Sequence, residues 1–171
     1  AISAANVTTL YEEIECPAAT VINSFNTVLY TGNGGTQSIS SVGFKPDFTW
    51  LKPRSQADNN NLFDTIRGVQ KQLISNNTSP QSTQSNTLTA FNSDGFSIGP
   101  DNNINTNGQT YVSWNWKGGG ITDTNTDGTI ESSVSASKEA GFSVVKWEGT
   151  DANATVGHGL SAKPQLILFK A

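Results

Sequence analysis

Residues 25–52, FNTVLYTGNGGTQSISSVGFKPDFTWLK, decide the fold, because much of their pattern returns at residues 142–170 as FSVVKWEGTDANATVGHGLSAKPQLILFK. In both stretches, short runs of β-branched and aromatic residues alternate with Gly, Asn and Pro, which is typical of short strands joined by turns. We therefore interpret the chain as carrying one β-rich unit twice. The matching residues are Phe25 and Phe142, Tyr30 and Trp147, Gly32 and Gly149, Ile39 and Val156, and, after a short gap, Lys45-Pro46 and Lys163-Pro164.

This repeat divides the chain into segments and predicts a piece of a longer modular polypeptide. The match to the first copy ends at Lys170, one residue before the last residue given, Ala171, and the first residue is Ala1 rather than Met. The alternative is that both copies form halves of one shared sandwich. The expected segments are the end of a preceding jelly-roll domain at 1–13, a linker at 14–24, a β-sandwich at 25–120, a second linker at 121–137 and the start of the second copy at 138–171.

The first copy is predicted to be a series of strands. Residues 25–31, 46–54 and 110–116 alternate between two faces and end at Gly, Asn or Pro. Residues 62–73, LFDTIRGVQKQL, fit either a helix or a strand with a bend near Arg67-Gly68, and we favour the strand. The expected fold is an all-β, antiparallel β-sandwich or jelly roll with a short helix near the N-terminus; an α+β fold is the alternative.

Composition excludes several classes of partner. The chain has a net charge of −4, and only 14% of its residues are charged. Its cations, among them Arg54, Arg67 and Lys71, are scattered, so we expect no nucleic-acid binding. No apolar run approaches the length of a membrane-spanning helix, and we expect no membrane insertion. The single Cys16 allows no internal disulfide.

The titratable residues form no catalytic motif. His158 is the only histidine, and it stands between two glycines where the first copy has Val42, which favours a turn residue over a general base. We therefore expect no catalytic residues, no cofactor and no enzyme, and keep an enzyme domain as the third alternative. The carboxylates fall mostly at strand ends and turns, at Asp47, Asp58, Asp64, Asp94 and Asp101.

One segment imitates half of a calcium-binding loop. Asp123, Asn125 and Asp127 precede Gly128 with the spacing of the first ligands of an EF-hand, but Val134 stands where the bidentate acid belongs. We favour a polar linker with an Asp-Gly turn and expect no metal site, while calcium binding remains the alternative.

The composition also supports the hypothesis that the chain binds sugars. Lectin sites combine an exposed aromatic platform with Asn, Asp and Gln side chains, and the chain is rich in both. We expect Trp114 and Trp116 to share an inward face, and the polar loops at 75–87 and 101–109 to be the better contact surfaces. The candidate platforms are Trp50, Trp114, Trp116 and Trp147.

Four segments of the first copy resemble a domain of uncharacterised function that is common in virion proteins of marine tailed phages. In that family a stretch like DGTIESSVSASKEAGFSVVKWEG follows and opens a second related unit. Separately, AISAANVTTLYEE resembles the closing strand and helix of laminin-G-like, concanavalin-type jelly rolls, which often precede this domain. The four segments are FNTVLYTGNGGTQSISSVGFKPDFTWLKPR, LFDTIRG, LTAFNSDGFSIG and TYVSWNWKGGG.

This resemblance implies a virion structural protein on the particle surface, such as a tail fibre or tail spike. Such proteins often act in host attachment and are often homotrimers. Other virion proteins are the expected partners, and a host surface glycan is one candidate ligand. The resemblance transfers no catalytic or ligand-binding residue. A carbohydrate-binding module of a secreted or cell-surface protein is the alternative function.

Overall fold

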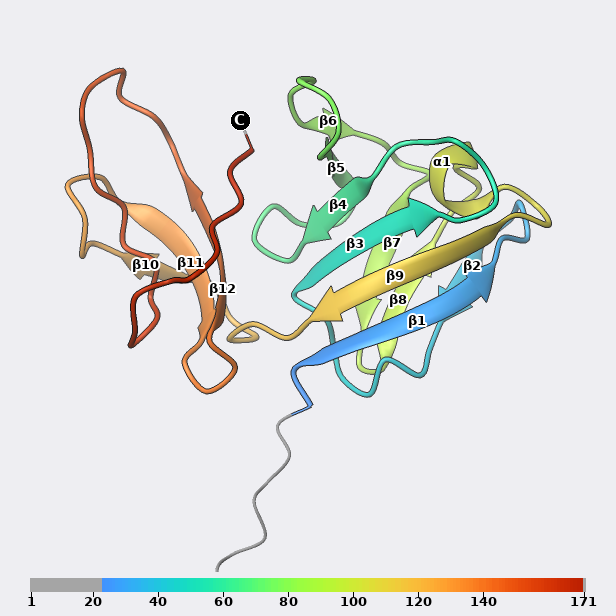
Figure 1. The fold of residues 1–171 in the computed structure, drawn as a ribbon, viewed down its shortest axis with the longest axis horizontal. Coiled ribbons are helices and arrows are strands. Elements are labelled where there is room, and N and C mark those ends of the chain that lie inside the picture. The colour runs from blue at the N-terminus through green and yellow to red at the C-terminus, as the bar shows by residue number, and fades with distance from the viewer. Residues whose placement is uncertain (1–22, 171) are drawn as a thin grey trace, which may run out of the picture.

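The computed structural model describes residues 23–170 (Figure 1). The helix expected at 1–13, most of the linker expected at 14–24, and Cys16 lie outside the described residues. Within residues 23–170, no helix is long and apolar enough to cross a membrane. The elements are β1 (Phe25–Thr31), β2 (Gln37–Ile39), β3 (Phe48–Pro53), β4 (Asn61–Asp64), β5 (Lys71–Ile74), β6 (Ser82–Thr83), β7 (Leu88–Asn92), β8 (Gly95–Ile98), α1 (Asn102–Asn105), β9 (Thr110–Trp116), β10 (Asp123–Asn125), β11 (Ser132–Ser137) and β12 (Phe142–Trp147).

The strands of the first copy form an antiparallel sandwich, as the sequence predicts. A six-stranded sheet has the order β1-β9-β3-β4-β5-β6, and a three-stranded sheet, β2-β8-β7, lies behind it in Figure 1. The long strand β9 pairs with β1 on one side and β3 on the other, so the first and last strands of this copy are neighbours. Strands β7 and β8 form a hairpin over residues 88–98.

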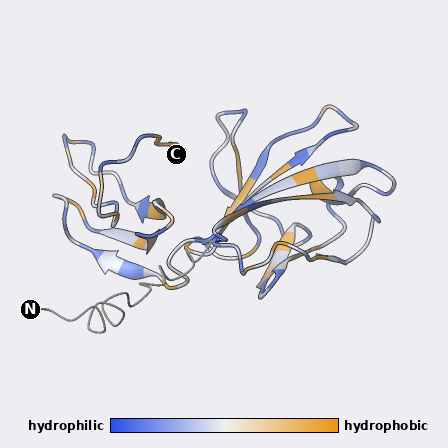
Figure 2. Ribbon diagram, turned by 60° about the horizontal axis from the view of Figure 1, so that its bottom comes forward, coloured by the Kyte–Doolittle hydropathy of each residue, from blue (hydrophilic) through white to orange (hydrophobic). Residues whose placement is uncertain are grey.

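The core lies between these two sheets, and Figure 2 shows the apolar bands along their strands. In β3, Thr49 and Leu51 are fully buried, whereas Phe48 and Trp50 are half-buried on the opposite face, which confirms the predicted alternation. Each large apolar side chain buried in such a core stabilises the fold by about 1.5–3 kcal/mol. The core residues are Tyr30, Ile39, Leu51, Phe63, Leu88, Phe96, Ile98, Ile104 and Tyr111.

Two tyrosines at the centre of this core stack on each other. The rings of Tyr30 and Tyr111 are 5.0 Å apart at an angle of 12°. Each hydroxyl is satisfied, because Tyr30 donates to the Ile104 carbonyl at 2.8 Å and Tyr111 accepts from the Thr106 amide at 2.9 Å. Burial raises the pKa of Tyr30 well above its ordinary value of 10.0, and the neighbouring Tyr111 raises it further.

The buried tyrosine predicts a loss of stability in alkali. Because the pKa of Tyr30 is raised in the folded state, its neutral form stabilises the fold fully below pH 10.0, and this contribution is lost as the pH rises above that value. We expect the difference in unfolding free energy between the wild type and Tyr30→Phe to be constant below pH 10.0 and to fall above it. The slope is at most about 1.4 kcal/mol per pH unit. Urea titrations from pH 8 to pH 11 measure it, and a flat difference would contradict the assignment.

The ambiguous segment at 62–73 is a β-hairpin, and the α+β alternative is wrong. Strands β4 and β5 flank the connection at 65–70, in which Gly68 has a φ of +91°. Arg67 closes the hairpin: it forms an ion pair with Asp64 and donates to the carbonyls of Leu62 and Lys71. The helical spacing of the apolar residues was therefore coincidental, and the bend lies where the sequence predicts it.

The loop at 101–109 is anchored in the core by its central residues, while Asn102, Asn107 and Gly108 are exposed. It contains α1, and both Ile104 and Asn105 are completely buried. The Asn105 amide donates to the carbonyls of Gly35 and Gly99 and accepts from the Asn33 amide at 2.9 Å. Asn105 thus holds the turn at 32–35, and its burial is possible because its polar atoms are satisfied.

The segment at 121–137, which was expected to be a linker, contains two strands of a sheet. It contains β10 and β11, which pair with β12 in a separate three-stranded sheet of order β10-β11-β12. The segment looks like a linker because its strands are rich in Ser and Thr and bury few apolar side chains. Gly118 and Gly119 pass close to Ser135 of β11, which accepts from the Gly119 amide at 3.1 Å.

Candidate interaction surface

The outer face of the six-stranded sheet carries a continuous set of large side chains. In register across β1, β9 and β3, one row is Phe25, Trp116 and Phe48, and the next contains Trp114 and Trp50. A third row begins with Leu29, which pairs with Val112. We call this set the aromatic face; its residues are Phe25, Leu29, Phe48, Trp50, Trp114 and Trp116.

The rings of the aromatic face are packed against one another. Trp116 lies 4.8 Å from Phe25 and 5.3 Å from Phe48, measured between ring centroids. Trp50 and Trp114 form an edge-to-face pair at 6.0 Å. Such contacts contribute about 0.5–1.5 kcal/mol each beyond the area that they bury. The face is therefore a rigid platform.

Trp114 and Trp116 point outward, so the expectation that they face the core is wrong. The inner positions of β9 are instead Tyr111, Ser113 and Asn115, all completely buried. The Asn115 amide donates to the Asn26 carbonyl and to the Ser113 hydroxyl, and accepts from Thr49. The alternation in the sequence correctly separates the two faces of β9. The more hydrophobic face was expected to be the inner one, but the inner face carries Ser113 and Asn115, which can be buried because their polar atoms are hydrogen-bonded.

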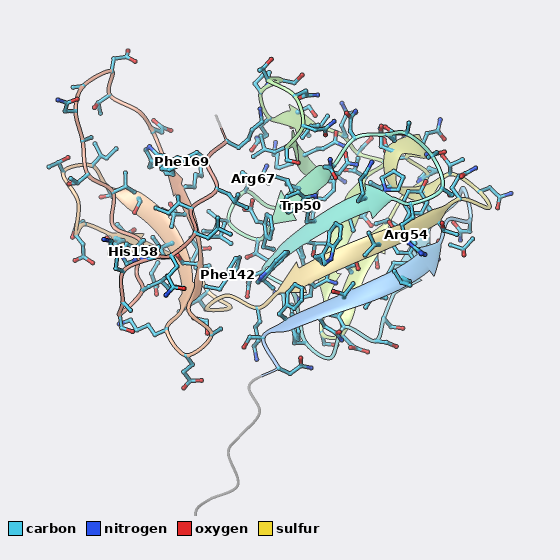
Figure 3. All side chains as sticks on the ribbon, viewed as in Figure 1. Trp50, Arg54, Arg67, Phe142, His158 and Phe169 are labelled. Carbon is cyan, nitrogen blue, oxygen red and sulfur yellow. The ribbon has the colours of Figure 1, made fainter. Side chains whose placement is uncertain are left out.

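The sheet β10-β11-β12 contacts only part of the aromatic face. Phe142, at the start of β12, stacks on Trp116 at 5.9 Å and lies 6.1 Å from Phe48 (Figure 3). The repeat in the sequence contains a signal for this contact, because Phe142 matches Phe25, which also packs on Trp116. On the edge strand β1, Phe25 and Leu29 are 49% and 60% exposed.

Of the other candidate platforms, Trp50 belongs to the open part of this face and Trp147 does not. Trp50 is half-buried and its indole NH points at the Asn60 side chain, 3.4 Å away. Trp147 lies in the sheet β10-β11-β12, edge-to-face with Phe169 at 5.7 Å. The loop at 75–87 is exposed over most of its length, as expected, and its strand β6 extends the sheet beyond β5.

The five carboxylates singled out in the sequence do not converge, and each accepts hydrogen bonds from its own separate donors. Asp47 and Asp64 are buried, the first accepting from Thr65 and Gly118 and the second paired with Arg67. Asp94 is exposed, and hydrogen bonds from the Gly43 and Ser41 amides lower its pKa. The remaining two shape their own loops: Asp101 accepts from the Asn103 amide at the start of α1, and Asp58 accepts from the Asn59 amide.

His158 and the EF-hand-like residues also serve local structure. The Nδ1 atom of His158 accepts from the Leu160 amide at 3.1 Å, within a turn. Asp123 and Asn125 belong to strand β10, and the Asn125 side chain accepts from the Asp127 amide at 2.9 Å. Across residues 23–170, no group of three or more His, Cys, Asp or Glu side chains is placed to hold a metal ion.

The comparisons with known proteins identify a family but no characterised relative. No curated protein matches this chain significantly. No solved structure matches it either. One family model covers residues 22–171, which includes both copies of the repeat and the aromatic face. The chain therefore belongs to the family described as a domain of unknown function, DUF7483.

Proposed function

We propose that this chain is a structural and interaction module of a tailed-phage virion, within a surface appendage such as a tail fibre or tail spike that contributes to host attachment. The observation that carries the proposal is the aromatic face, which runs to the uncharged edge strand β1 with Phe25 and Leu29 exposed. Long uncharged edge strands with apolar side chains are prone to pairing with another chain. Such a surface suits a subunit that is built into an oligomer.

A homotrimer is the assembly that we propose, with β1 and the adjoining aromatic face at its interface. Leu29 is the best residue to test, because it is 60% exposed and its matching position in the second copy is Lys146. Lysine is therefore compatible with the strand, and Leu29→Lys should leave the fold of the protomer intact. It would place a charge in the subunit interface, where an unpaired charge is unfavourable.

Sedimentation velocity of the full chain tests this assembly. We expect the wild type to sediment as a trimer over a wide range of concentrations. Leu29→Lys should sediment as a monomer that keeps the circular-dichroism spectrum of the wild type, and its melting temperature should fall by the contribution of the lost subunit contacts. Ile121→Lys is the matched control, because Ile121 is equally exposed, at 67%, but lies away from the sheet. A monomeric wild type, or a trimer that Leu29→Lys leaves intact, would refute the interface.

The location on the particle needs a separate experiment. Antibodies raised against the chain should decorate the tail appendages of the intact phage in electron micrographs. Labelling that occurs only on lysed cells and never on purified particles would refute the virion assignment.

A carbohydrate-binding module is the second candidate, because the structure turns Trp50 and Trp114 to the outside. In this case a glycan array should detect binding by the wild type, and Trp50→Ala should abolish that binding. Trp147→Ala, in the sheet β10-β11-β12, should not affect it. Glycan binding that survives Trp50→Ala would exclude the aromatic face as the sugar site.

A further inference from the structure

We propose that Asn107 is a site of spontaneous covalent modification, at which its side-chain amide is lost by reaction with the backbone nitrogen of Gly108. The other Asn-Gly pair of the chain, Asn33-Gly34, has the same local sequence but is protected by the fold. This inference concerns the chemistry of one turn and does not depend on the virion assignment.

The reaction needs only water and the chain itself. The backbone nitrogen of the residue after Asn attacks the side-chain carbon Cγ, and the new N–C bond closes a succinimide ring. The bond from Cγ to the side-chain nitrogen breaks, and that nitrogen leaves as ammonia with the proton that the backbone nitrogen gives up. Water then opens the ring at either carbonyl, which yields Asp or isoaspartate. Glycine after Asn favours the attack because it has no Cβ atom and reaches many backbone conformations.

The turn at Asn107 leaves the reacting groups open. Asn107 and Gly108 are both exposed, and the Asn107 side chain has no hydrogen-bond partner within residues 23–170, unlike the neighbouring Thr106, whose hydroxyl donates to the Asn102 carbonyl. Gly108 has a φ of +77°, and a Cβ atom there would meet nothing within 4 Å. The turn therefore has room to rearrange around the attacking nitrogen.

One hydrogen bond opposes the attack at this turn. The Gly108 amide donates to the Gly32 carbonyl at 2.9 Å, and this bond must open before the nitrogen can reach the side chain. A single hydrogen bond of this kind slows such an opening by about twofold to tenfold. Turns at the surface open locally without unfolding the domain. Asn107 should therefore react more slowly than in an unfolded chain, but it should still react.

The other pair is held by several hydrogen bonds at once. The Asn33 side-chain oxygen accepts from the Gly35 amide at 2.8 Å and from the Asn105 side chain at 3.1 Å, and its nitrogen donates to the Thr36 carbonyl at 3.3 Å. The attacking nitrogen, that of Gly34, donates to the Asn105 carbonyl at 2.9 Å. Because Asn105 is completely buried, this anchor cannot open locally. The three additional bonds should slow the reaction at Asn33 by at least about tenfold relative to the exposed pair.

The modification would loosen the end of the β1–β9 ladder (Figure 1). Beyond the last pair, Thr31 with Thr110, the Gly32 amide donates to the Gln109 carbonyl and the Gly32 carbonyl accepts from Gly108. The nitrogen of a succinimide carries no hydrogen, so the second of these bonds is lost. Isoaspartate restores the hydrogen but lengthens the backbone by one carbon atom, which prevents the bond from forming again in register. We therefore expect the isoaspartate form to melt at a lower temperature than the unmodified chain.

The test is ageing of the full chain in mildly alkaline buffer, followed by mass spectrometry of its peptides and labelling of isoaspartate with an isoaspartyl methyltransferase. In the folded chain, Asn107 should convert progressively to Asp and isoaspartate, and Asn33 at least about tenfold more slowly. In guanidinium chloride the two pairs should react at similar rates, because their local sequences are alike and the hydrogen bonds are gone.

Asn107→Gln is the variant that separates modification from other ageing. Glutamine would have to close a larger ring, so this variant should release much less ammonia. Its melting temperature when freshly prepared should equal that of the wild type, because the Asn107 side chain has no partner within residues 23–170 to lose. After ageing, the melting temperature of the wild type should have fallen, and that of Asn107→Gln should not.

Three results would overturn the proposal. The first is an unmodified Asn107 in the folded chain when the unfolded chain is modified there, which would show that the bond to Gly32 is enough to protect it. The second is equal rates at Asn33 and Asn107 in the folded chain. The third is ammonia release that Asn107→Gln leaves unchanged, which would place the reaction at another residue.

Discussion

Replacing Gly32 with alanine is expected to destabilise the chain by about 3 kcal/mol, a large fraction of the stability of a typical domain. A Cβ atom at Gly32 would lie 2.3 Å from the Thr106 carbonyl oxygen and 2.9 Å from the Asn105 carbonyl carbon. Both are backbone atoms, and they cannot move aside cheaply. Gly32 is also hydrogen-bonded at both ends, from its amide to Gln109 and from Gly108 to its carbonyl.

Gly149 provides the matched control, because it is the residue of the second copy that aligns with Gly32. A Cβ atom there would meet nothing within 4 Å. Gly149→Ala should therefore change the unfolding free energy by less than about 0.5 kcal/mol. Urea denaturation of both variants measures the difference. Equal effects at the two positions would show that the loop carrying Thr106 does not pack on Gly32 as described.

Replacing Asp47 with alanine is the second large effect that we expect, a loss of about 3 kcal/mol. The Asp47 carboxylate is buried, with 1% of the residue exposed, and accepts from the Thr65 hydroxyl at 2.9 Å and the Gly118 amide at 2.8 Å. Alanine would leave both donors without a partner in a place that water does not reach. The melting temperature should fall by roughly 10 °C.

The size of this effect should depend on burial rather than on the number of hydrogen bonds. Asp94 also accepts two hydrogen bonds from donors distant in sequence, but it is exposed to solvent. Asp94→Ala should therefore lower the melting temperature much less than Asp47→Ala, because water replaces the lost acceptor. Asp47→Asn should fall between, since an amide oxygen keeps one acceptor and its NH₂ group opposes the other donor. Similar losses at Asp47 and Asp94 would contradict the buried position of Asp47.

The hydrogen bonds of Asp47 also connect the six-stranded sheet to the segment that leads into the sheet β10-β11-β12. The Asp47 amide donates to the Trp116 carbonyl at the end of β9, and its carboxylate accepts from the Gly118 amide. From Gly118 the chain passes to the sheet β10-β11-β12. Loss of this carboxylate is therefore expected to loosen the contact of Phe142 with Trp116. A change in tryptophan fluorescence before the main unfolding transition of Asp47→Ala would reveal it.

The sequence predicted much of the local structure of the first copy. Runs such as FNTVLYT and TYVSWNW alternate with a period of two, and the structure has strands there. Even the ambiguous run at 62–73 was placed correctly, because Gly68 can adopt a positive φ and breaks a helix. By contrast, the segment at 121–137 failed, because strands β10 and β11 are short, polar and recognisable only by their pairing with β12.

By itself, the sequence determined the repeat, the strands of the first copy and the turns between them, since these follow from the conformational preferences of neighbouring residues. Only the tertiary structure decided which face of β9 is the core, that Asn105 and Asp47 are buried, and that Trp50 and Trp114 lie on an outer face. The reason is physical. A polar side chain can be buried only if partners from distant segments satisfy it, and the order of residues along one chain does not state which distant segments meet.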